Sequence, residues 1–146
     1  MPKYYTVEEA NKTLPLVRRI VTDIVASHHD RVEAIKEYGH LDHDFESMQI
    51  GRRELDEQLR DLTDRINRFI DELEDIGVIF KGFEEGLVDF YAMMTDREVF
   101  LCWKLGEAQV DYWHELEAGY AGRQLLATVD EDEDEDEDGG ESGGNG

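Results

Sequence analysis

A change in the spacing of the apolar residues, near Gly77, constrains this chain more than any other feature of its sequence. Before Gly77, apolar residues recur every three and four positions, which is the spacing of one face of a helix. After Gly77, apolar and polar residues alternate, which is the pattern of a half-buried strand. The sequence therefore predicts an α+β protein, with helices first and a small antiparallel sheet after Gly77.

Two glycines and a proline divide the helical half. Pro15 fits the first turn of a long helix, where its missing N–H costs nothing, so a separate short helix that begins at Val7 is expected before it. Gly39 ends the long helix. The apolar residues from Leu55 to Ile76 follow a heptad of the coiled-coil type, which Gly77 closes. Two long helices joined by a short polar loop are expected to pack as an antiparallel hairpin.

The second half predicts an antiparallel meander, with strands at residues 78–81, 87–93, 98–105 and 108–115. A tight turn at residues 94–97 would pair Asp89 with Cys102 on the next strand. Gly106 favours another tight turn, which would place Asp111 beside Cys102 on the strand after that. Residues 111–117 also fit a helix, and that alternative stays open.

The two faces of the predicted sheet differ, because successive side chains of a strand point to opposite sides. One face is apolar, includes His114, and is expected to pack on the helical hairpin. The other face carries Asp89, Cys102 and Asp111 among aromatic residues. A monomer seldom leaves such a face bare, so we expect either residues 116–126 or a second subunit to cover it.

The net charge and the length of the chain limit its possible partners, its habitat and its number of domains. The formal net charge is −22, and ten of these negative charges lie in residues 130–141, so the rest of the chain is also acidic. Such a surface repels phosphates and anionic lipids, which argues against nucleic acid or membrane partners. High salt would screen the self-repulsion, so a halophilic cytoplasm suits this protein. We expect one domain, residues 1–128, and a disordered acidic tail, residues 129–146.

Cysteine usage and the N-terminus indicate the compartment. A single cysteine excludes an internal disulfide, and charges occupy the N-terminal residues where a signal peptide would need an apolar run. The sequence also lacks an apolar run long enough to span a bilayer. These features predict a cytoplasmic protein.

Four short motifs occur in order along the chain, namely YTVEEANKTLPLVR, GLVDFYA, LCWKLGE and YWHELEAGYAGR. Together they resemble the uncharacterised domain-of-unknown-function family 2203, over about residues 4–124. The resemblance implies that Asp89, Glu107, His114 and Arg123 belong to one family signature, and it implies no particular reaction. The acidic tail and the HLDHD loop lie outside the resemblance.

A candidate metal site follows from the predicted register, which aligns Asp89, Cys102 and Asp111 across three neighbouring strands. Carboxylate and thiolate groups are both zinc ligands, so these side chains could bind a divalent metal. The structural alternative is an ion pair between Asp89 and Lys104, with Cys102 packed as a small apolar residue.

A second candidate site follows from the helical alternative, in which Asp111, His114 and Glu115 share one helix face. With Glu107 they would form a carboxylate and histidine metal site, although a single histidine among aromatic residues is more commonly a hydrogen-bonded core residue. Arg123 could bind a small anionic ligand, or it could form a structural bidentate pair with Glu107 or Asp111.

Two functions are compatible with these features. The first is a non-catalytic binding or assembly module, which forms a homodimer through its helical seam or through the second face of its sheet. The second is a metal-dependent hydrolase that uses the carboxylate and histidine cluster, with Arg123 steering an anionic substrate.

Overall fold

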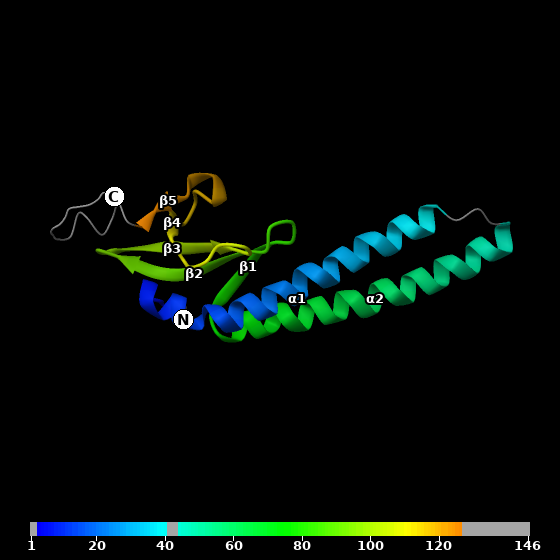
Figure 1. Ribbon diagram of the computed structural model, residues 1–146, viewed down its shortest axis with the longest axis horizontal. Coiled ribbons are helices and arrows are strands. Elements are labelled where there is room, and N and C mark those ends of the chain that lie inside the picture. The colour runs from blue at the N-terminus through cyan, green and yellow to red at the C-terminus, as the bar shows by residue number, and fades with distance from the viewer. Residues whose placement is uncertain (1–2, 41–43, 127–146) are drawn as a thin grey trace.

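The computed structural model describes residues 3–40 and 44–126, which form two long helices and a five-stranded antiparallel sheet (Figure 1). The predicted α+β architecture is therefore confirmed, whereas the predicted acidic tail and loop residues 41–43 lie outside the described residues. The elements in chain order are α1 (Val7–Gly39), α2 (Phe45–Asp75), β1 (Val78–Gly82), β2 (Leu87–Met94), β3 (Arg97–Lys104), β4 (Tyr112–Glu115), the short helix η1 (Tyr120–Gly122) and β5 (Gln124–Leu125).

Helix α1 is one continuous helix, so the prediction of a separate short helix before Pro15 was wrong. A proline inside a helix costs about 3 kcal/mol, because it removes one backbone hydrogen bond and crowds the preceding turn. Leu14 and Val17, on either side of it, are buried in the core. Burial of such side chains contributes about 1.5–3 kcal/mol each, which is enough to keep the helix continuous through the proline.

Helix α2 begins earlier than its heptad predicts. The side chain of Asp44 caps it by accepting a hydrogen bond from the backbone N–H of Ser47 (2.8 Å), so residues expected in a polar connection are helical. The helix ends just before Gly77, which has φ +81° as a terminating glycine should. α1 and α2 lie side by side and antiparallel, as predicted (Figure 1).

The sheet has the strand order β1-β2-β3-β4-β5, and each strand is antiparallel to its neighbours. The predicted pairing of β2 with β3 is confirmed, including Asp89 opposite Cys102 and Phe90 opposite Leu101. The two-residue strand β5 was not predicted. It pairs with β4, so the chain after β4 returns to the edge of the sheet.

The predicted register of the third strand of the meander was wrong by one residue. The turn after β3 closes between Lys104 and Glu107, with 3.1 Å between the carbonyl oxygen and the amide nitrogen, and Gly106 takes the third position of that turn with φ +105°. A loop follows, and β4 begins only at Tyr112, which lies opposite Cys102 in place of Asp111. The helical alternative for residues 111–117 is also wrong, because β4 occupies most of that segment.

A shift of one residue turns every side chain of a strand to the opposite face. His114 therefore leaves the face that packs on the helices, and Trp113 takes a place in the core. The sheet contributes apolar side chains from β1, β2, β3, β4 and the loop before β4 to this core: Val78, Val88, Phe90, Ala92, Val99, Leu101, Trp103, Val110 and Trp113. The other face of the sheet carries Asp89, Cys102 and His114.

The helices are longer than the sheet that they support. Helix α1 has 33 residues and is about 50 Å long, and the sheet covers only one end of the hairpin (Figure 1). The remainder projects as an arm that consists of α1 and α2 alone. Neither of the described helices contains an apolar stretch of the length and hydropathy needed to cross a membrane.

Candidate functional site

Three potential ligand side chains meet on the sheet face opposite the helices. Asp89 comes from β2, Cys102 from β3 and His114 from β4, and one ligand atom of each lies within 4.8 Å of the others. The Nε2 atom of His114 lies 3.1 Å from Oδ1 of Asp89. The three residues are 2%, 0% and 2% exposed respectively, so this cluster is as buried as the core.

The strand register explains how these side chains meet. Asp89 and Cys102 are direct cross-strand partners, whereas His114 lies opposite Phe100 and reaches diagonally over β3 toward Asp89. The imidazole is fixed at its other nitrogen, because Nδ1 lies 2.7 Å from the carbonyl oxygen of Glu115. A carbonyl oxygen can only accept, so Nδ1 carries a hydrogen, and a shared proton joins Nε2 to the Asp89 carboxyl.

Burial dominates the electrostatics of this cluster. Burial raises the pKa of the Asp89 carboxyl. The charge of His114 and the hydrogen bonds from His114 and Cys102 lower this pKa, but they offset only part of the effect of burial. Burial and then the negative charge of Asp89 raise the pKa of the Cys102 thiol to about 12, although the nearby Arg123 acts in the opposite direction. Cys102 is therefore a neutral thiol and not an activated nucleophile.

Aromatic rings cover the cluster. The ring centroids of Tyr91 and Phe100 are 4.8 Å apart, and those of Phe100 and His114 are 5.4 Å apart. The guanidinium carbon of Arg123 lies 3.8 Å from the ring centroid of Tyr112 on the other side. Residues 116–126, one of the two expected covers of this face, therefore contribute at least Arg123 to it.

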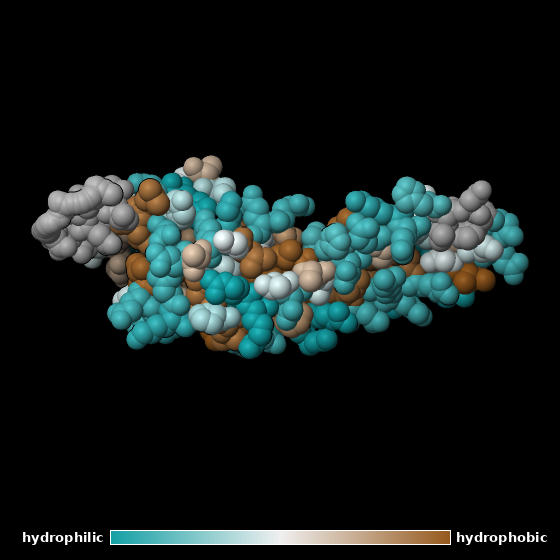
Figure 2. Space-filling view, viewed as in Figure 1, coloured by the Kyte–Doolittle hydropathy of each residue, from teal (hydrophilic) through white to brown (hydrophobic). Residues whose placement is uncertain are grey.

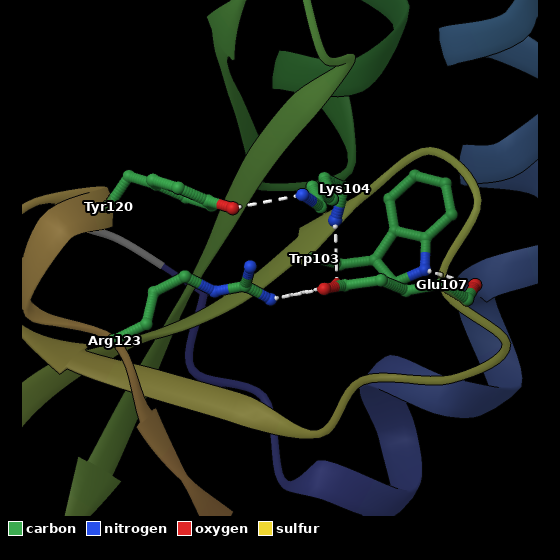
Figure 3. A network of polar contacts seen from close by, with 5 residues as sticks. All are labelled: Trp103, Lys104, Glu107, Tyr120 and Arg123. Carbon is green, nitrogen blue, oxygen red and sulfur yellow. Dashed lines mark hydrogen bonds and ion pairs between the residues drawn. The ribbon is translucent and has the colours of Figure 1, made fainter.

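Glu107 and Arg123 form a separate ion pair beside the cluster (Figure 3). One guanidinium nitrogen of Arg123, Nη2, donates to both carboxylate oxygens of Glu107, at 2.8 and 2.6 Å. Glu107 also accepts from the backbone N–H of Lys104 (3.0 Å), and its carbonyl accepts from the indole of Trp103 (2.9 Å). Burial alone would lower the pKa of Arg123, but the hydrogen bond and charge of Glu107 outweigh it and the pKa is raised.

The remaining predicted site residues lie apart from the cluster. Asp111 accepts a hydrogen bond from Gln109 (2.8 Å) in the loop before β4. Glu115 forms an exposed ion pair with Arg97 (2.6 Å). Lys104 donates to the hydroxyl of Tyr120 (2.9 Å), so the expected Asp89–Lys104 pair was wrong. The predicted set of Glu107, Asp111 and His114 is therefore not a single site.

Sequence reasoning missed the two tyrosines that hold Arg123. The guanidinium carbon of Arg123 lies between the rings of Tyr112 and Tyr120, at 3.8 and 4.8 Å from their centroids. The signal was present in the segment GYAGR, where Gly119, with φ +68°, redirects the chain before η1. Attention to cation–π partners of the arginine would have identified both residues.

The arm of the helical hairpin is a second candidate site, and we define it as residues 35–39 of α1 and 45–61 of α2. None of these residues is buried, in contrast to Ala34 and Leu62 at its base. Large apolar side chains are nevertheless exposed there, with Ile35 at 53%, Phe45 at 75% and Met48 at 45% exposure. Figure 2 shows brown patches among hydrophilic side chains along this part of the molecule.

The two sides of the hairpin differ in charge. On the side away from the sheet, a groove of about 400 Å³ lies between the helices near the base of the arm. Four carboxylates and one arginine are among its lining residues: Asp30, Glu33, Glu37, Asp61 and Arg65. On the side that faces the sheet, Arg31 donates to Thr63 (3.2 Å) and lies over the ring of Phe83.

A protein-family model described as "Uncharacterized conserved protein (DUF2203)" matches residues 3–126. This range includes both helices, all five strands and every candidate site residue. No curated protein and no solved structure matches the chain.

Proposed function

The chain belongs to the uncharacterised DUF2203 family, and we propose from its structure that it is a non-catalytic assembly module that pairs with a second copy through its helical arm. The observation that carries this proposal is the arm itself, a stretch of two-helix hairpin with exposed apolar side chains and no buried residue of its own. Two amphipathic helices bury little between them, whereas four form a stable bundle.

Most of the exposed large apolar side chains of the arm share one side, and Ile50 is the exception. Ile35 lies two turns beyond His28, whose ring stacks on Phe83 at 4.7 Å, so Ile35 continues the stripe that packs on the sheet. Phe45 precedes Thr63 by eighteen residues, which is about five full helical turns, so it points to the same side as Thr63 and Arg31. We call Ile35, Phe45 and Met48 the apolar stripe.

Charge favours a second copy on this side. A partner with the same acidic composition would be repelled by the carboxylates of the groove on the far side. On the side of the apolar stripe, Arg52 is paired with Asp56 at 3.1 Å, so the charge of this carboxylate is offset by a cation. The sheet leaves this side of the arm open (Figure 1), and an antiparallel arm from a second copy would fill that space.

The geometry gives less support to the metal-dependent hydrolase. Its substrate would have to reach a cluster of Asp89, Cys102 and His114 that is at most 2% exposed. Arg123, which was expected to steer an anionic substrate, donates to both carboxylate oxygens of Glu107. Asp111 and Glu115 lie outside the cluster. Because the cluster is buried and Arg123 is ion-paired with Glu107, we favour a non-catalytic protein.

Light scattering coupled to gel filtration tests the proposal. We expect a mass of twice 16.9 kDa at micromolar concentration in high salt, which screens the repulsion between two acidic chains. Ile35→Asp and Phe45→Asp place a carboxylate in the apolar stripe and should give the monomer mass. Both positions are exposed in the single chain, so the helical circular dichroism should not change.

Ile50→Asp is the matched control, because Ile50 is exposed to 47% but lies on the other side of α2 from the apolar stripe. This variant should keep the dimer mass. A monomeric wild-type protein at tens of micromolar would refute the proposal. Equal loss of the dimer in Ile50→Asp and Phe45→Asp would refute the assignment to this side of the arm.

A further inference from the structure

The buried cluster on the sheet contains the donor atoms of a metal site. We infer that Asp89, Cys102 and His114 bind one divalent ion of the zinc class, which links strands β2, β3 and β4. Each strand provides one ligand, and the three ligand atoms lie within 4.8 Å of one another. Ligand atoms of a tetrahedral ion with bonds of about 2.0–2.3 Å lie roughly 3.3–3.8 Å apart, so the longest separation in the cluster would have to shorten by roughly 1 Å when an ion binds.

The chemical types of the ligands select the metal. A thiolate, an imidazole and a carboxylate form a mixed set that suits zinc, whereas magnesium and calcium prefer oxygen ligands alone. His114 is already held in the orientation that a ligand needs, since its Nδ1 donates to the carbonyl oxygen of Glu115 and its Nε2 points at Asp89. A backbone carbonyl in that role is the common way to fix a metal-binding histidine.

Charge also favours a divalent ion at this position. Without an ion, the cluster must hold a carboxyl group and a thiol in surroundings that are nearly free of water. When an ion binds, the Cys102 thiol proton and the proton shared by Asp89 and His114 leave to solvent. The carboxylate and the thiolate then neutralise the two positive charges of the ion, and the imidazole is neutral. The loaded site would carry no net charge.

A neighbouring arginine completes the surroundings of the thiolate. Arg123 lies close enough to Cys102 for its charge to favour the ionised sulfur, and its buried Nε–H has no hydrogen-bond partner among the described residues. A metal-bound thiolate is a better acceptor than a thiol. Within residues 3–40 and 44–126 no fourth histidine, cysteine, aspartate or glutamate joins the group, so a water molecule would complete a tetrahedral ion.

Cobalt(II) is the probe for this site, because a cobalt–thiolate bond gives intense near-ultraviolet charge-transfer absorption. The full chain is stripped with a chelator and titrated with cobalt, and we expect this absorption to saturate at one equivalent. The carboxylates of the acidic tail also attract divalent ions, but they have no sulfur and cannot produce that signal. Zinc should then displace the cobalt and remove the absorption.

Cys102→Ala is the informative variant, because alanine fits the space of a buried cysteine that packs as a small apolar residue. It should abolish the charge-transfer absorption, and His114→Asn should weaken cobalt binding more than about 100-fold, beyond the effect typical of a residue that only supports a ligand. Asp111→Asn and His29→Gln, which alter a carboxylate and an imidazole outside the cluster, should bind cobalt as the wild type does.

Two results would overturn the inference. The first is a folded wild-type protein that shows no charge-transfer absorption at several equivalents of cobalt, which would leave the cluster as a hydrogen-bonded network. The second is absorption that persists in Cys102→Ala. Neither result bears on the dimer, because the apolar stripe shares no residue with this cluster.

Discussion

The ion pair between Glu107 and Arg123 should stabilise the fold far more than the exposed ion pairs on the surface. Its side chains are 19% and 9% exposed, whereas those of Glu115 and Arg97 are 45% and 53% exposed. Both pairs have a shortest nitrogen-to-oxygen distance of 2.6 Å and two side-chain hydrogen bonds, and they differ strongly in burial. They therefore form a matched comparison.

The magnitude follows from the burial. Removal of one partner from a fully buried ion pair costs about 3–5 kcal/mol, because the other charge is left without compensation. Partial exposure reduces this value, so Glu107→Gln and Arg123→Met should each lower the free energy of unfolding by about 2–3 kcal/mol. The glutamine retains an acceptor for the Lys104 N–H, and the methionine retains an apolar stem between Tyr112 and Tyr120.

Urea denaturation of both single variants and of the double variant measures the coupling between the two residues. Urea is uncharged, so it does not screen the pair as guanidinium chloride would. We expect a coupling energy of about 1.5–3 kcal/mol for Glu107 with Arg123, against about 0.2–1 kcal/mol for Glu115 with Arg97. Equal coupling energies in the two pairs would refute the argument from burial.

Two further perturbations test the covering of the sheet and its contact with α1. The Cys102 thiol has no exposed surface, and its pKa is raised to about 12 from 9.0. In the folded protein it should therefore react with a thiol reagent at pH 8 about 1,000-fold more slowly than in the protein unfolded in urea. Equal rates in the two states would contradict the burial of this thiol. Gly86 has φ +66° and would place a new Cβ at 2.9 Å from atoms of Leu105 and Val21, so Gly86→Ala should cost about 2–4 kcal/mol in urea denaturation. Gly106→Ala, with open space around it, is the control for Gly86→Ala and should cost less.

Much of the fold could be predicted because two local signals agree. The change of spacing near Gly77 separates helices from strands, and the short turn between β2 and β3 leaves one register, so the pairing of Asp89 with Cys102 followed from sequence alone. The exposure of the arm was harder to predict from the sequence. Its heptad at Leu55 and Leu59 looks the same whether the seam is closed inside the hairpin or is half-exposed, as the structure has it.

The candidate site depended on a turn that the sequence does not determine. Glycine can occupy the first central position of one tight turn or the second of another, and the observed turn together with the loop after it shifts β4 by one residue. Gly106 takes the second central position, with φ +105°, and a loop follows it. The ligand pair of Asp89 and Cys102 was therefore predictable, whereas the third member, His114, was not.

Burial energetics explain why the chain adopts the observed register. The predicted register would have placed the imidazole of His114 against the helices, where a buried polar group without a partner costs about 1–3 kcal/mol. In the observed register His114 meets Asp89, and Trp113 enters the core. Burial of a tryptophan removes about 150–250 Å² from water, worth about 4–6 kcal/mol at 25 cal/mol per Å². The indole N–H of Trp113 has no partner among the described residues, but that cost is smaller than the gain from burial. The preference of one tryptophan for the core thus brings His114 to Asp89 and Cys102, and the candidate metal site is a consequence of core packing.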